Sequence, residues 1–336
     1  MSDGVSVPGL VSIVVVGHNN WPELEMAIAS ALGQTYPHIE VVVVDNNSTD
    51  ETSAEVPDRF GQKIRYVRQS DTSHGGGYNC GIAISTGAFV HLLDGDDVLS
   101  PTMIEKQVAM LDQDKSLDAV YGDTRPFFDE PGIEPELRSE KYFLKDYDDF
   151  LAALIRVDDN GYIIPSSILF RRSMLDRIGP FIASQGPWEN IWGHTDREYL
   201  LRAANAGCRF RYSPRALVFY RQHHRQMSQD VERVARGYDV LLEQMEQTIT
   251  REPYHGMLRS VRARRLFSRA MSVKSGRTKA LAELRRARTS DSQTISLLRY
   301  ALGVIVIFFP GGPWVYSLQR HLRSGRLCRR MLEGAN

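Results

Sequence analysis

Three carboxylates fall within four positions in the segment Asp94-Gly95-Asp96-Asp97. Acidic side chains this close repel one another, so something must offset the repulsion. One candidate is a divalent cation, because Mg²⁺ and Mn²⁺ prefer oxygen ligands and complete their shell with water and substrate phosphates. The other is that Asp94 and Asp97 cap the turn and the helix predicted to start near Pro101. The spacing alone leaves both interpretations open.

Two further polar segments follow apolar runs. Asp45 ends a run of four valines, and an acid there can accept hydrogen bonds from a nucleotide base or ribose. Asp50 could do the same, but capping of the following helix is its favoured role. The glycine-rich segment Gly75–Gly81 predicts a loop whose backbone N–H groups could approach a phosphate, although a loop without a ligand would have the same composition. It is neither a dinucleotide fingerprint nor a Walker-type phosphate loop.

The elements that must position these residues alternate along the N-terminal third of the chain. Apolar runs predict buried strands, and the segments between them keep helical spacing. The predicted strands are 12–16, 39–44, 64–67 and 88–93. This alternation predicts an α/β fold with a parallel sheet and helices on both faces. The polar segments 17–20, 45–50 and 94–97 all follow strands, so we expect them to meet at the edge where ligands bind in such sheets.

Later elements are more mixed, and charge divides the chain. The pattern predicts helices at 150–155, 172–178 and 196–206, strands at 162–170 and 216–220, and mainly helix from about 229. Residues 1–250 carry 23 Lys and Arg against 37 Asp and Glu, whereas residues 251–336 carry 18 against 4. No nucleic-acid-binding motif accompanies the basic region, so no nucleic-acid partner is expected.

The apolar run Tyr300–Phe309 follows the most basic part of the chain. It is shorter than the roughly 20 residues that span a bilayer. It predicts either an interfacial helix on anionic lipid or a buried helix with a solvated basic face. Cys80, Cys208 and Cys328 are too few and too far apart for a disulfide framework, which favours a reducing, cytoplasmic compartment. The N-terminal apolar run lacks a preceding basic region and predicts a strand, not a signal peptide.

From residue 10 to 228 several motifs follow one another. They run from SIVVVGHNN through VVVVDNNSTDET and GAFVHLLDGDD to GHTDREYLL and VFYRQHHRQMS. This series resembles the family 2 glycosyltransferases of the GT-A fold. The resemblance implies a Rossmann-like, mostly parallel sheet with helices on both faces. It implies a glycosyltransferase domain at 1–228, with 10–122 as the nucleotide-sugar-binding half and 123–228 as the acceptor half. The resemblance stops before the basic tail, so the helical basic C-terminal region at 229–336 is expected from pattern and charge alone.

The resemblance also implies roles for single residues. Asp45 corresponds to the acid that contacts the nucleotide base. Asp94 and Asp96 correspond to the Asp-X-Asp pair, with Asp94 near the ribose and Asp96 on the metal that bridges the diphosphate. Asp196 corresponds to the general base, and His223 to a histidine that closes over the diphosphate and could ligate the metal. The remaining expected nucleotide-sugar contacts are Gly17, Asn19 and Asn79.

Some positions depart from the family pattern. Thr195 stands where the family usually has Glu, which leaves Asp196 as the only acid of that motif. Tyr78 stands where a basic residue often precedes the asparagine, and His18 replaces a common aromatic. The membrane-polymerase motif Gln-X-X-Arg-Trp is absent from the sequence, which argues against a processive synthase. Acceptor contacts are weakly predicted, and the candidates are Trp188, Glu189, Trp192 and His194.

The expected activity is inverting transfer of one sugar from a nucleotide-diphosphate sugar, with a UDP-sugar favoured, to a glycan or lipid-linked acceptor. The expected cofactor is Mn²⁺ or Mg²⁺, and the setting is polysaccharide or cell-envelope biosynthesis in the cytoplasm or on the inner face of the plasma membrane. The alternative is a non-catalytic nucleotide-sugar-binding or scaffold protein of a membrane glycan-assembly complex, supported only by Thr195. A nucleotidyltransferase fits less well, because the glycine- and lysine-rich loop expected near its first strand is missing.

Overall fold

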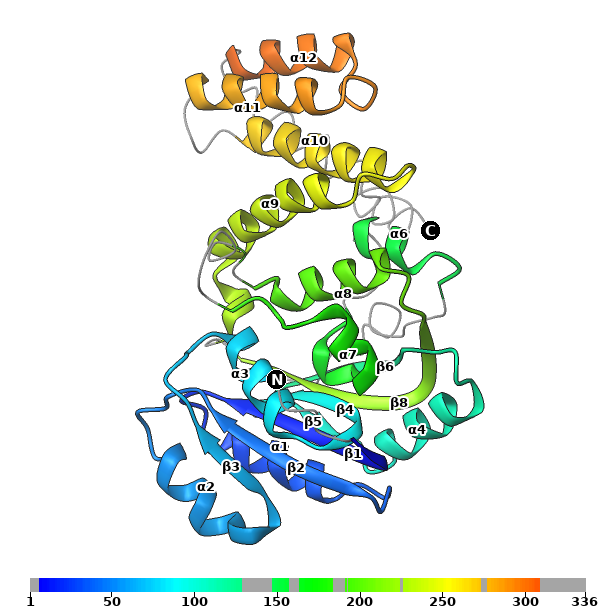
Figure 1. The fold of residues 1–336 in the computed structure, drawn as a ribbon. Coiled ribbons are helices and arrows are strands. Elements are labelled where there is room, and N and C mark those ends of the chain that lie inside the picture. The colour runs from blue at the N-terminus through cyan, green and yellow to red at the C-terminus, as the bar shows by residue number, and fades with distance from the viewer. Residues whose placement is uncertain are drawn as a thin grey trace, which may run out of the picture. The chain divides into compact units, whose positions relative to one another are not determined.

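The computed structural model describes residues 6–128, 147–156, 163–183, 191, 193–223, 226–272 and 277–308. The chain forms two compact units, residues 1–241 and 242–336. The division lies within helix α9 (Val231–Thr248, Figure 1), so it falls after the boundary predicted at residue 228. The first unit carries all the predicted site residues, and the second carries most of the basic C-terminal residues.

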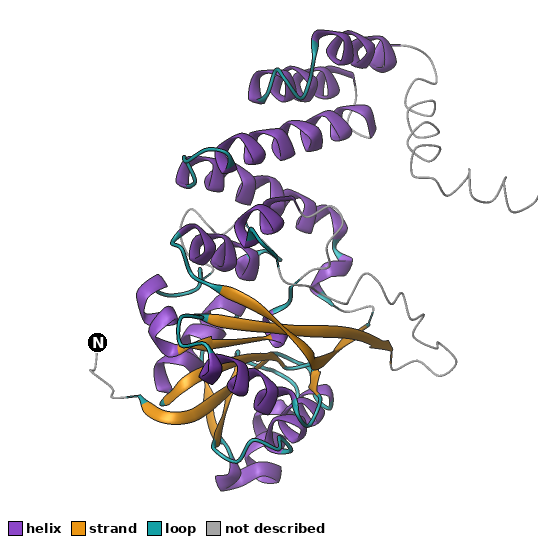
Figure 2. Cartoon of the chain, turned by 90° about the vertical axis from the view of Figure 1, so that its right-hand side faces the viewer, coloured by secondary structure: helices purple, strands orange, loops and turns teal. Residues whose placement is uncertain are grey.

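The first unit is built around one eight-stranded sheet (Figures 1 and 2). Its strands are β1 (Val7–Gly17), β2 (Ile39–Asp45), β3 (Arg65–Arg68), β4 (Gly87–Asp94), β5 (Val98–Leu99), β6 (Ala119–Phe128), β7 (Ile168–Arg171) and β8 (Phe210–Gln222), in the spatial order β3-β2-β1-β4-β7-β6-β8-β5. The four strands before residue 95 are mutually parallel, as predicted. Strand β7 is antiparallel to both of its neighbours, so the sheet as a whole is mixed.

Helices cover both faces of this sheet (Figure 2). Successive residues of a strand face opposite sides, so one strand serves two cores. On one face Ile13 of β1 packs in a cluster with α1 (Glu23–Leu32) and α4 (Met103–Gln113). On the other face Val14 of β1 lies against α3 (His74–Ile84). The other α-helices among the described residues of this unit before α9 are α2 (Thr52–Phe60), α6 (Phe150–Arg156), α7 (Arg172–Ile178) and α8 (Thr195–Asn205).

The prediction of a loop at Gly75–Gly81 is wrong, because this segment forms most of helix α3. Ser73 caps the helix by accepting a hydrogen bond from the Gly76 N–H at 3.1 Å. The glycines serve close packing, since a Cβ on Gly81 would lie 2.1 Å from Cγ1 of Val14 on β1. Helix α3 therefore approaches the sheet more closely than a larger residue would allow.

Replacing Gly81 with alanine should destabilise the first unit, because the added methyl group would overlap Val14. Overpacking typically costs about 1–3 kcal/mol of the free energy of unfolding. At a contact this short we expect it to outweigh the about 1 kcal/mol by which alanine favours a helix over glycine. Denaturant unfolding followed by circular dichroism measures the loss. Ala83→Ser, at an exposed position of α3, should stay near the wild-type value, and a Gly81→Ala variant as stable as wild type would contradict the packing.

The strand predicted at 162–170 is shorter in the structure. Pro165–Ser167 form a 3₁₀ turn, and only Ile168–Arg171 pair as strand β7. Proline has no N–H to donate to a ladder, which explains why pairing starts after it. Tyr162 lies outside the described residues. Strand β8, in contrast, extends beyond the predicted 216–220 on both sides.

His91, within β4, is fully buried. Burial lowers the pKa of His91 from its ordinary value of 6.5 to about 4. Between these pH values the unfolded chain binds a proton that the folded chain does not. The free energy of unfolding therefore falls as the pH falls from 6.5 to 4, by about 3 kcal/mol in total from this group. Above pH 6.5 the histidine is neutral in both states and has no effect on the pH dependence.

We therefore expect the stability of the wild type to fall more steeply than that of His91→Leu between pH 6.5 and 4. Denaturant midpoints measured across this range, each referred to the same protein at pH 7.5, give the two slopes. His38→Asn is the matched control, because His38 is exposed and its removal should leave the wild-type slope unchanged. Parallel profiles for wild type and His91→Leu would refute the assignment.

The second unit is helical. It contains the end of α9, then α10 (Tyr254–Ser272), α11 (Arg277–Ser290) and α12 (Leu297–Phe308). The last three helices share an apolar cluster of Ala270, Met271, Ala280, Leu284 and Ile307. The apolar segment predicted at 300–309 thus coincides largely with α12, in which Ile307 is buried and Leu302 is 52% exposed. None of the described helices is long and apolar enough to cross a membrane.

Candidate active site

The carboxyl ends of β1, β2 and β4 meet at one edge of the sheet. The strand register pairs Gly17 of β1 with Asp45 of β2, and Val16 of β1 with Asp94 of β4. The loops that follow are also joined, since the Asn46 N–H donates to the Gly17 carbonyl at 2.8 Å. The prediction that the polar segments after these strands meet at one edge is therefore confirmed.

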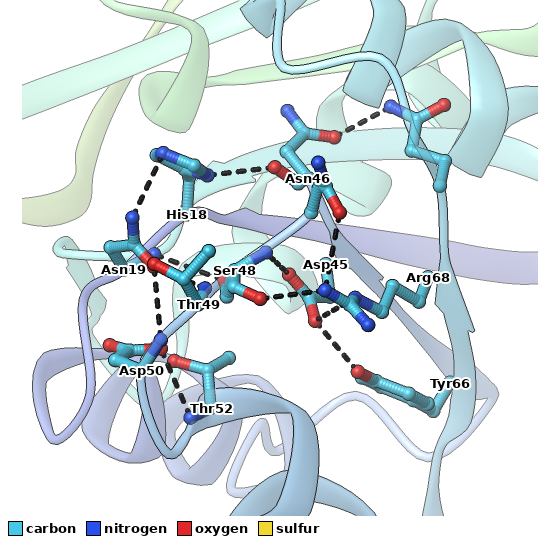
Figure 3. Close-up of polar contacts among 12 residues, drawn as sticks. His18, Asn19, Asp45, Asn46, Ser48, Thr49, Asp50, Thr52, Tyr66 and Arg68 are labelled. Carbon is cyan, nitrogen blue, oxygen red and sulfur yellow. Dashed lines mark hydrogen bonds and ion pairs between the residues drawn. The ribbon is translucent and has the colours of Figure 1, made fainter.

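Asp45 is fully buried, and its carboxylate has three neighbours (Figure 3). Oδ1 accepts a hydrogen bond from the Ser48 N–H at 2.7 Å, and Oδ2 accepts one from the Tyr66 hydroxyl at 2.8 Å. Arg68 Nε lies 3.6 Å from Oδ2. Burial and the Asp45 carboxylate raise the pKa of Tyr66, so the phenol stays protonated and donates. The sequence analysis missed Tyr66 and Arg68, although the β2–β3 register places Arg68 opposite Asp45.

Asn19 ties the loop after β1 to the loop after β2 (Figure 3). Its φ is +50°, a left-handed conformation that asparagine tolerates better than most residues. Its Oδ1 accepts from the Thr49 N–H at 2.7 Å, and its N–H donates to Ser48 Oγ at 3.0 Å. Asp50 accepts from the Thr52 N–H at 3.1 Å at the first residue of α2, although Glu51 and not Asp50 occupies the N-cap position. Asn19 thus shapes this edge, and its contact with a ligand stays a prediction.

Asp94 is paired with a histidine that the sequence analysis did not single out. His74 Nε2, at the start of α3, lies 2.8 Å from Asp94 Oδ1, and the Tyr78 hydroxyl donates to the same oxygen. Burial opposes charge on both groups. Nevertheless, the negative charge of Asp94 raises the pKa of His74, and His74 lowers the pKa of Asp94. Tyr78 stands where the family often has a basic residue. The raised pKa of His74 favours a cation beside Asp94 instead.

Asp97 differs from the other two acids because it is completely buried. Its Oδ1 accepts a hydrogen bond from the Arg221 N–H at 3.1 Å. Burial, together with the charges of Asp96 and Asp94, raises the pKa of Asp97 well above its ordinary value and favours the neutral carboxyl. A neutral Asp97 removes much of the repulsion within the acid cluster. This position suits a structural role for Asp97 and not contact with a ligand.

Arg221, near the end of β8, is completely buried beneath the acid cluster. Its Nε donates to the carbonyl of Asp96 at 2.7 Å, and its guanidinium carbon lies 4.5 Å from the centre of the Phe127 ring. Arg221 therefore fixes the backbone that carries Asp96. The sequence analysis missed it, and the only signal was its place in the Tyr-Arg-Gln-His segment that contains His223.

Asp96 and His223 come together from distant parts of the chain. Asp96 Oδ2 lies 3.1 Å from His223 Nε2, and the two side chains are 29% and 21% exposed. In the part of the chain that the structure describes, no three His, Cys, Asp or Glu side chains gather as a metal centre. The Asp96 carboxylate nevertheless fits Mg²⁺ or Mn²⁺, because these ions prefer oxygen ligands and complete their shell with substrate phosphates and water, and His223 Nε2 lies beside it as a second candidate ligand.

Asp196 lies in the first turn of α8, close to the acid cluster. Its negative charge contributes to the raised pKa of both His74 and Tyr78 on α3. The start of α8 also packs against α3, since a Cβ on Gly75 would lie 2.9 Å from Cγ2 of Thr195, the neighbour of Asp196. Phe181 links the two helices further along, since its ring centre lies 5.3 Å from that of Tyr78 on α3 and 3.8 Å from that of Tyr199 on α8. The fold thus brings the predicted general base near the start of α3, whose His74 contacts Asp94.

A family model described as "Glycosyl transferase family 2" matches residues 12–179, which is half of the chain. The chain belongs to glycosyl transferase family 2. An uncharacterized glycosyltransferase of Nostoc sp. is 28% identical over 181 residues, 51% of this chain and 53% of that protein. Chondroitin synthase of Escherichia coli is 30% identical over 118 residues, 34% of this chain and 17% of that protein. The chain thus spans about half or less of the length of these relatives.

Solved structures of other glycosyltransferases share the fold of this family 2 chain. S. aureus TarS 1–349, solved in complex with UDP-GlcNAc, gives a TM-score of 0.63 at 16% identity over 89% of both chains. The mannosyltransferase PcManGT of Pyrobaculum calidifontis, solved in complex with GDP-Man and Mn²⁺, gives 0.56 at 19% identity over 96% of this chain and 88% of that chain. At these identities the likeness concerns the fold, and it is the GT-A type expected from the sequence.

Other predicted site residues of this glycosyl transferase family 2 chain have structural partners. The Asn79 carboxamide forms two hydrogen bonds with the backbone of Phe181. Its Nδ2 donates to the Phe181 carbonyl and its Oδ1 accepts from the Phe181 N–H, each at 2.8 Å. Asn79 therefore anchors the segment after α7, and its contact with a nucleotide sugar stays a prediction. His194 Nε2 lies 2.9 Å from the Val234 carbonyl. The candidate acceptor residues outside the described residues are Trp188, Glu189 and Trp192.

Proposed function

We propose that the protein is an inverting glycosyltransferase that moves one sugar from a nucleotide-diphosphate sugar to a glycan or lipid-linked acceptor. The observation that carries this proposal is the contact of Asp96, just after the end of β4, with His223 from a distant part of the chain. Such a transfer needs a site for the nucleotide base, a site for the diphosphate and a residue that acts as general base. Separate segments of the chain supply candidates for all three.

The proposed donor is a UDP-sugar. Its base would bind beside Asp45, against Tyr66 and the exposed Arg68, which border the buried carboxylate. Its ribose would lie near Asp94, and the loop that holds Gly17 and Asn19 would border it. The bound UDP-GlcNAc of TarS and GDP-Man of PcManGT support a nucleotide sugar as donor without deciding the base.

In the proposed reaction Asp196 accepts the proton of an acceptor hydroxyl while the hydroxyl oxygen attacks the anomeric carbon. A positioned base of this kind contributes on the order of 10²–10⁴ to the rate. The bond from the anomeric carbon to the diphosphate oxygen breaks on the opposite side, so the configuration inverts. One displacement needs no nucleophilic carboxylate, in contrast to retaining glycoside hydrolysis. The nucleoside diphosphate leaves with its negative charge.

Asp96 and His223 are the residues proposed to hold Mn²⁺ or Mg²⁺. When bound, such an ion acts as a Lewis acid that stabilises the charge of the leaving diphosphate. The raised pKa of His74 favours its imidazolium form, which would place a positive charge, held by Asp94, beside the same region. We place the reaction in polysaccharide or cell-envelope synthesis, in the cytoplasm or on the inner face of the plasma membrane.

A thermal-shift screen of nucleotide sugars, with and without Mn²⁺, tests the donor. At a concentration 100-fold above its Kd, the cognate donor should raise the melting temperature by about 5–10 °C. The product should then carry the anomeric configuration opposite to that of the donor, as measured by NMR. The alternative that Thr195 supports is a scaffold that only binds the donor. It predicts the rise in melting temperature without any glycosylated product. A product with retained configuration, or no shift with any nucleotide sugar, would contradict the proposal.

A further inference from the structure

Among the described residues of the second unit, some basic side chains of α10 are neutralised by acids. Arg262 of α10 contacts Glu243 at 2.9 Å and Glu246 at 2.7 Å. Arg269 of α10 contacts Glu283 at 2.7 Å. Much of the positive charge of α10 is therefore offset within the unit itself.

Helix α11 presents other basic side chains. Lys279, Arg285 and Arg286 are exposed and form no ion pair or hydrogen bond with any described residue. The only acid of α11, Glu283, is buried against Arg269, so no negative charge lies on the exposed side of this helix. We define the α11 face as the exposed residues Thr278, Lys279, Ala282, Arg285, Arg286 and Thr289.

Helix α12 adds exposed apolar surface beside α11. The two helices pack closely, since a Cβ on Gly303 would lie 2.9 Å from Cδ2 of Leu284. Next to Gly303, Leu302 is 52% exposed and Ala301 is also exposed. The only charged residue of α12 is Arg299, which is an exposed cation. This part of the unit therefore combines unneutralised cations with an exposed leucine and no exposed acid on either helix.

We propose that the α11 face, together with Leu302, binds the surface of an anionic phospholipid membrane. Cations near such a surface are attracted to its lipid headgroups, and an exposed apolar side chain can enter the headgroup region. Nucleic acid would account for the cations but would leave Leu302 without a partner. The inference rests on the proposed function in one respect, since it names the surface on which a lipid-linked acceptor would be met.

Vesicle co-sedimentation of the full chain tests this proposal. Wild-type protein should bind vesicles of phosphatidylcholine mixed with phosphatidylglycerol, and hardly bind vesicles of phosphatidylcholine alone. Removing the three charges in K279Q/R285Q/R286Q should weaken binding by roughly 100-fold, because each cation near the surface contributes about fivefold. The matched control K63Q/K115Q/R236Q removes three exposed cations of the first unit and should bind like wild type.

Two further variants separate charge and insertion from folding. The charge-retaining variant K279R/R285K/R286K should bind like wild type, and L302S should weaken binding by about tenfold because an apolar group leaves the headgroup region. Equal binding by the charge-removed variant and its control would overturn the proposal. Binding to duplex DNA without binding to anionic vesicles would also overturn it.

The lipid result and the transfer result are independent. Release of nucleoside diphosphate in solution, without vesicles, should be the same for wild type and K279Q/R285Q/R286Q, because none of these residues lies in the first unit. Loss of lipid binding with normal release would uphold both proposals. Absence of release from wild type that still binds anionic vesicles would contradict the proposed transfer and leave the lipid surface supported.

Discussion

Asp96→Ala should abolish the part of donor binding that depends on a divalent cation. Of the three clustered acids, Asp94 is held by His74 and Tyr78, and Asp97 is completely buried. Asp96 has neither constraint. Its only side-chain contact with a described residue is His223, at 3.1 Å. Because the ion would neutralise the diphosphate, we expect donor affinity in Mn²⁺ to fall on the order of 100-fold.

Isothermal titration with the donor, in Mn²⁺ and in EDTA, measures this effect. Wild type in EDTA should resemble Asp96→Ala in Mn²⁺, and His223→Ala should show a loss in the same direction. Asp112→Ala is the matched control, because it removes an exposed acid from α4 and should leave the affinity unchanged. Equal donor affinity of wild type and Asp96→Ala in Mn²⁺ would rule out Asp96 as the metal ligand.

Asp196→Asn should retain donor binding and lose transfer. The amide has the shape of the carboxylate but cannot take the proton of an acceptor hydroxyl. We expect kcat to fall on the order of 10²–10⁴, the range typical of a positioned general base, with the donor Kd within about threefold of wild type. Transfer to acceptor, followed by chromatography of the product, measures kcat, and titration measures Kd.

The control for this substitution is Asp176→Asn, which makes the same chemical change at an exposed position of α7. It should leave both kcat and Kd near wild type. A variant Asp196→Asn with wild-type kcat would show that another group accepts the proton. A variant that lost donor binding together with kcat would instead assign Asp196 to the donor site.

The strand half of the fold was predictable because its signals are local. Strands such as Ile39–Asp45 are buried on both faces and appear in the sequence as uninterrupted apolar runs. Their polar ends then had to meet, since parallel strands end at the same edge, and the pairing of Val16 with Asp94 shows that they do. The separate roles of Asp94 and Asp96 come from the resemblance and stay predictions, whereas the burial of Asp97 is a finding of the structure.

What the sequence could not predict depends on contacts between distant segments. Gly75–Gly81 has the composition of a loop, and only the approach of α3 to Val14 explains why a helix needs glycine there. Likewise, the sequence does not show which partners His74, Tyr66 and Arg221 have in the fold. Their importance comes from partners that folding brings to them, and composition carries no record of those pairs.

Release of nucleoside diphosphate tests the central claim most directly. Purified full chain with Mn²⁺ is incubated with a panel of nucleotide sugars, with and without glycan and lipid extracts as acceptors, beside Asp196→Asn. We predict that wild type releases nucleoside diphosphate from one nucleotide sugar and that one acceptor stimulates this release. Asp196→Asn should release it more slowly, by a factor on the order of 10²–10⁴. No release by wild type from any donor with any acceptor, while a donor still binds, would contradict the glycosyltransferase and favour the non-catalytic binding protein.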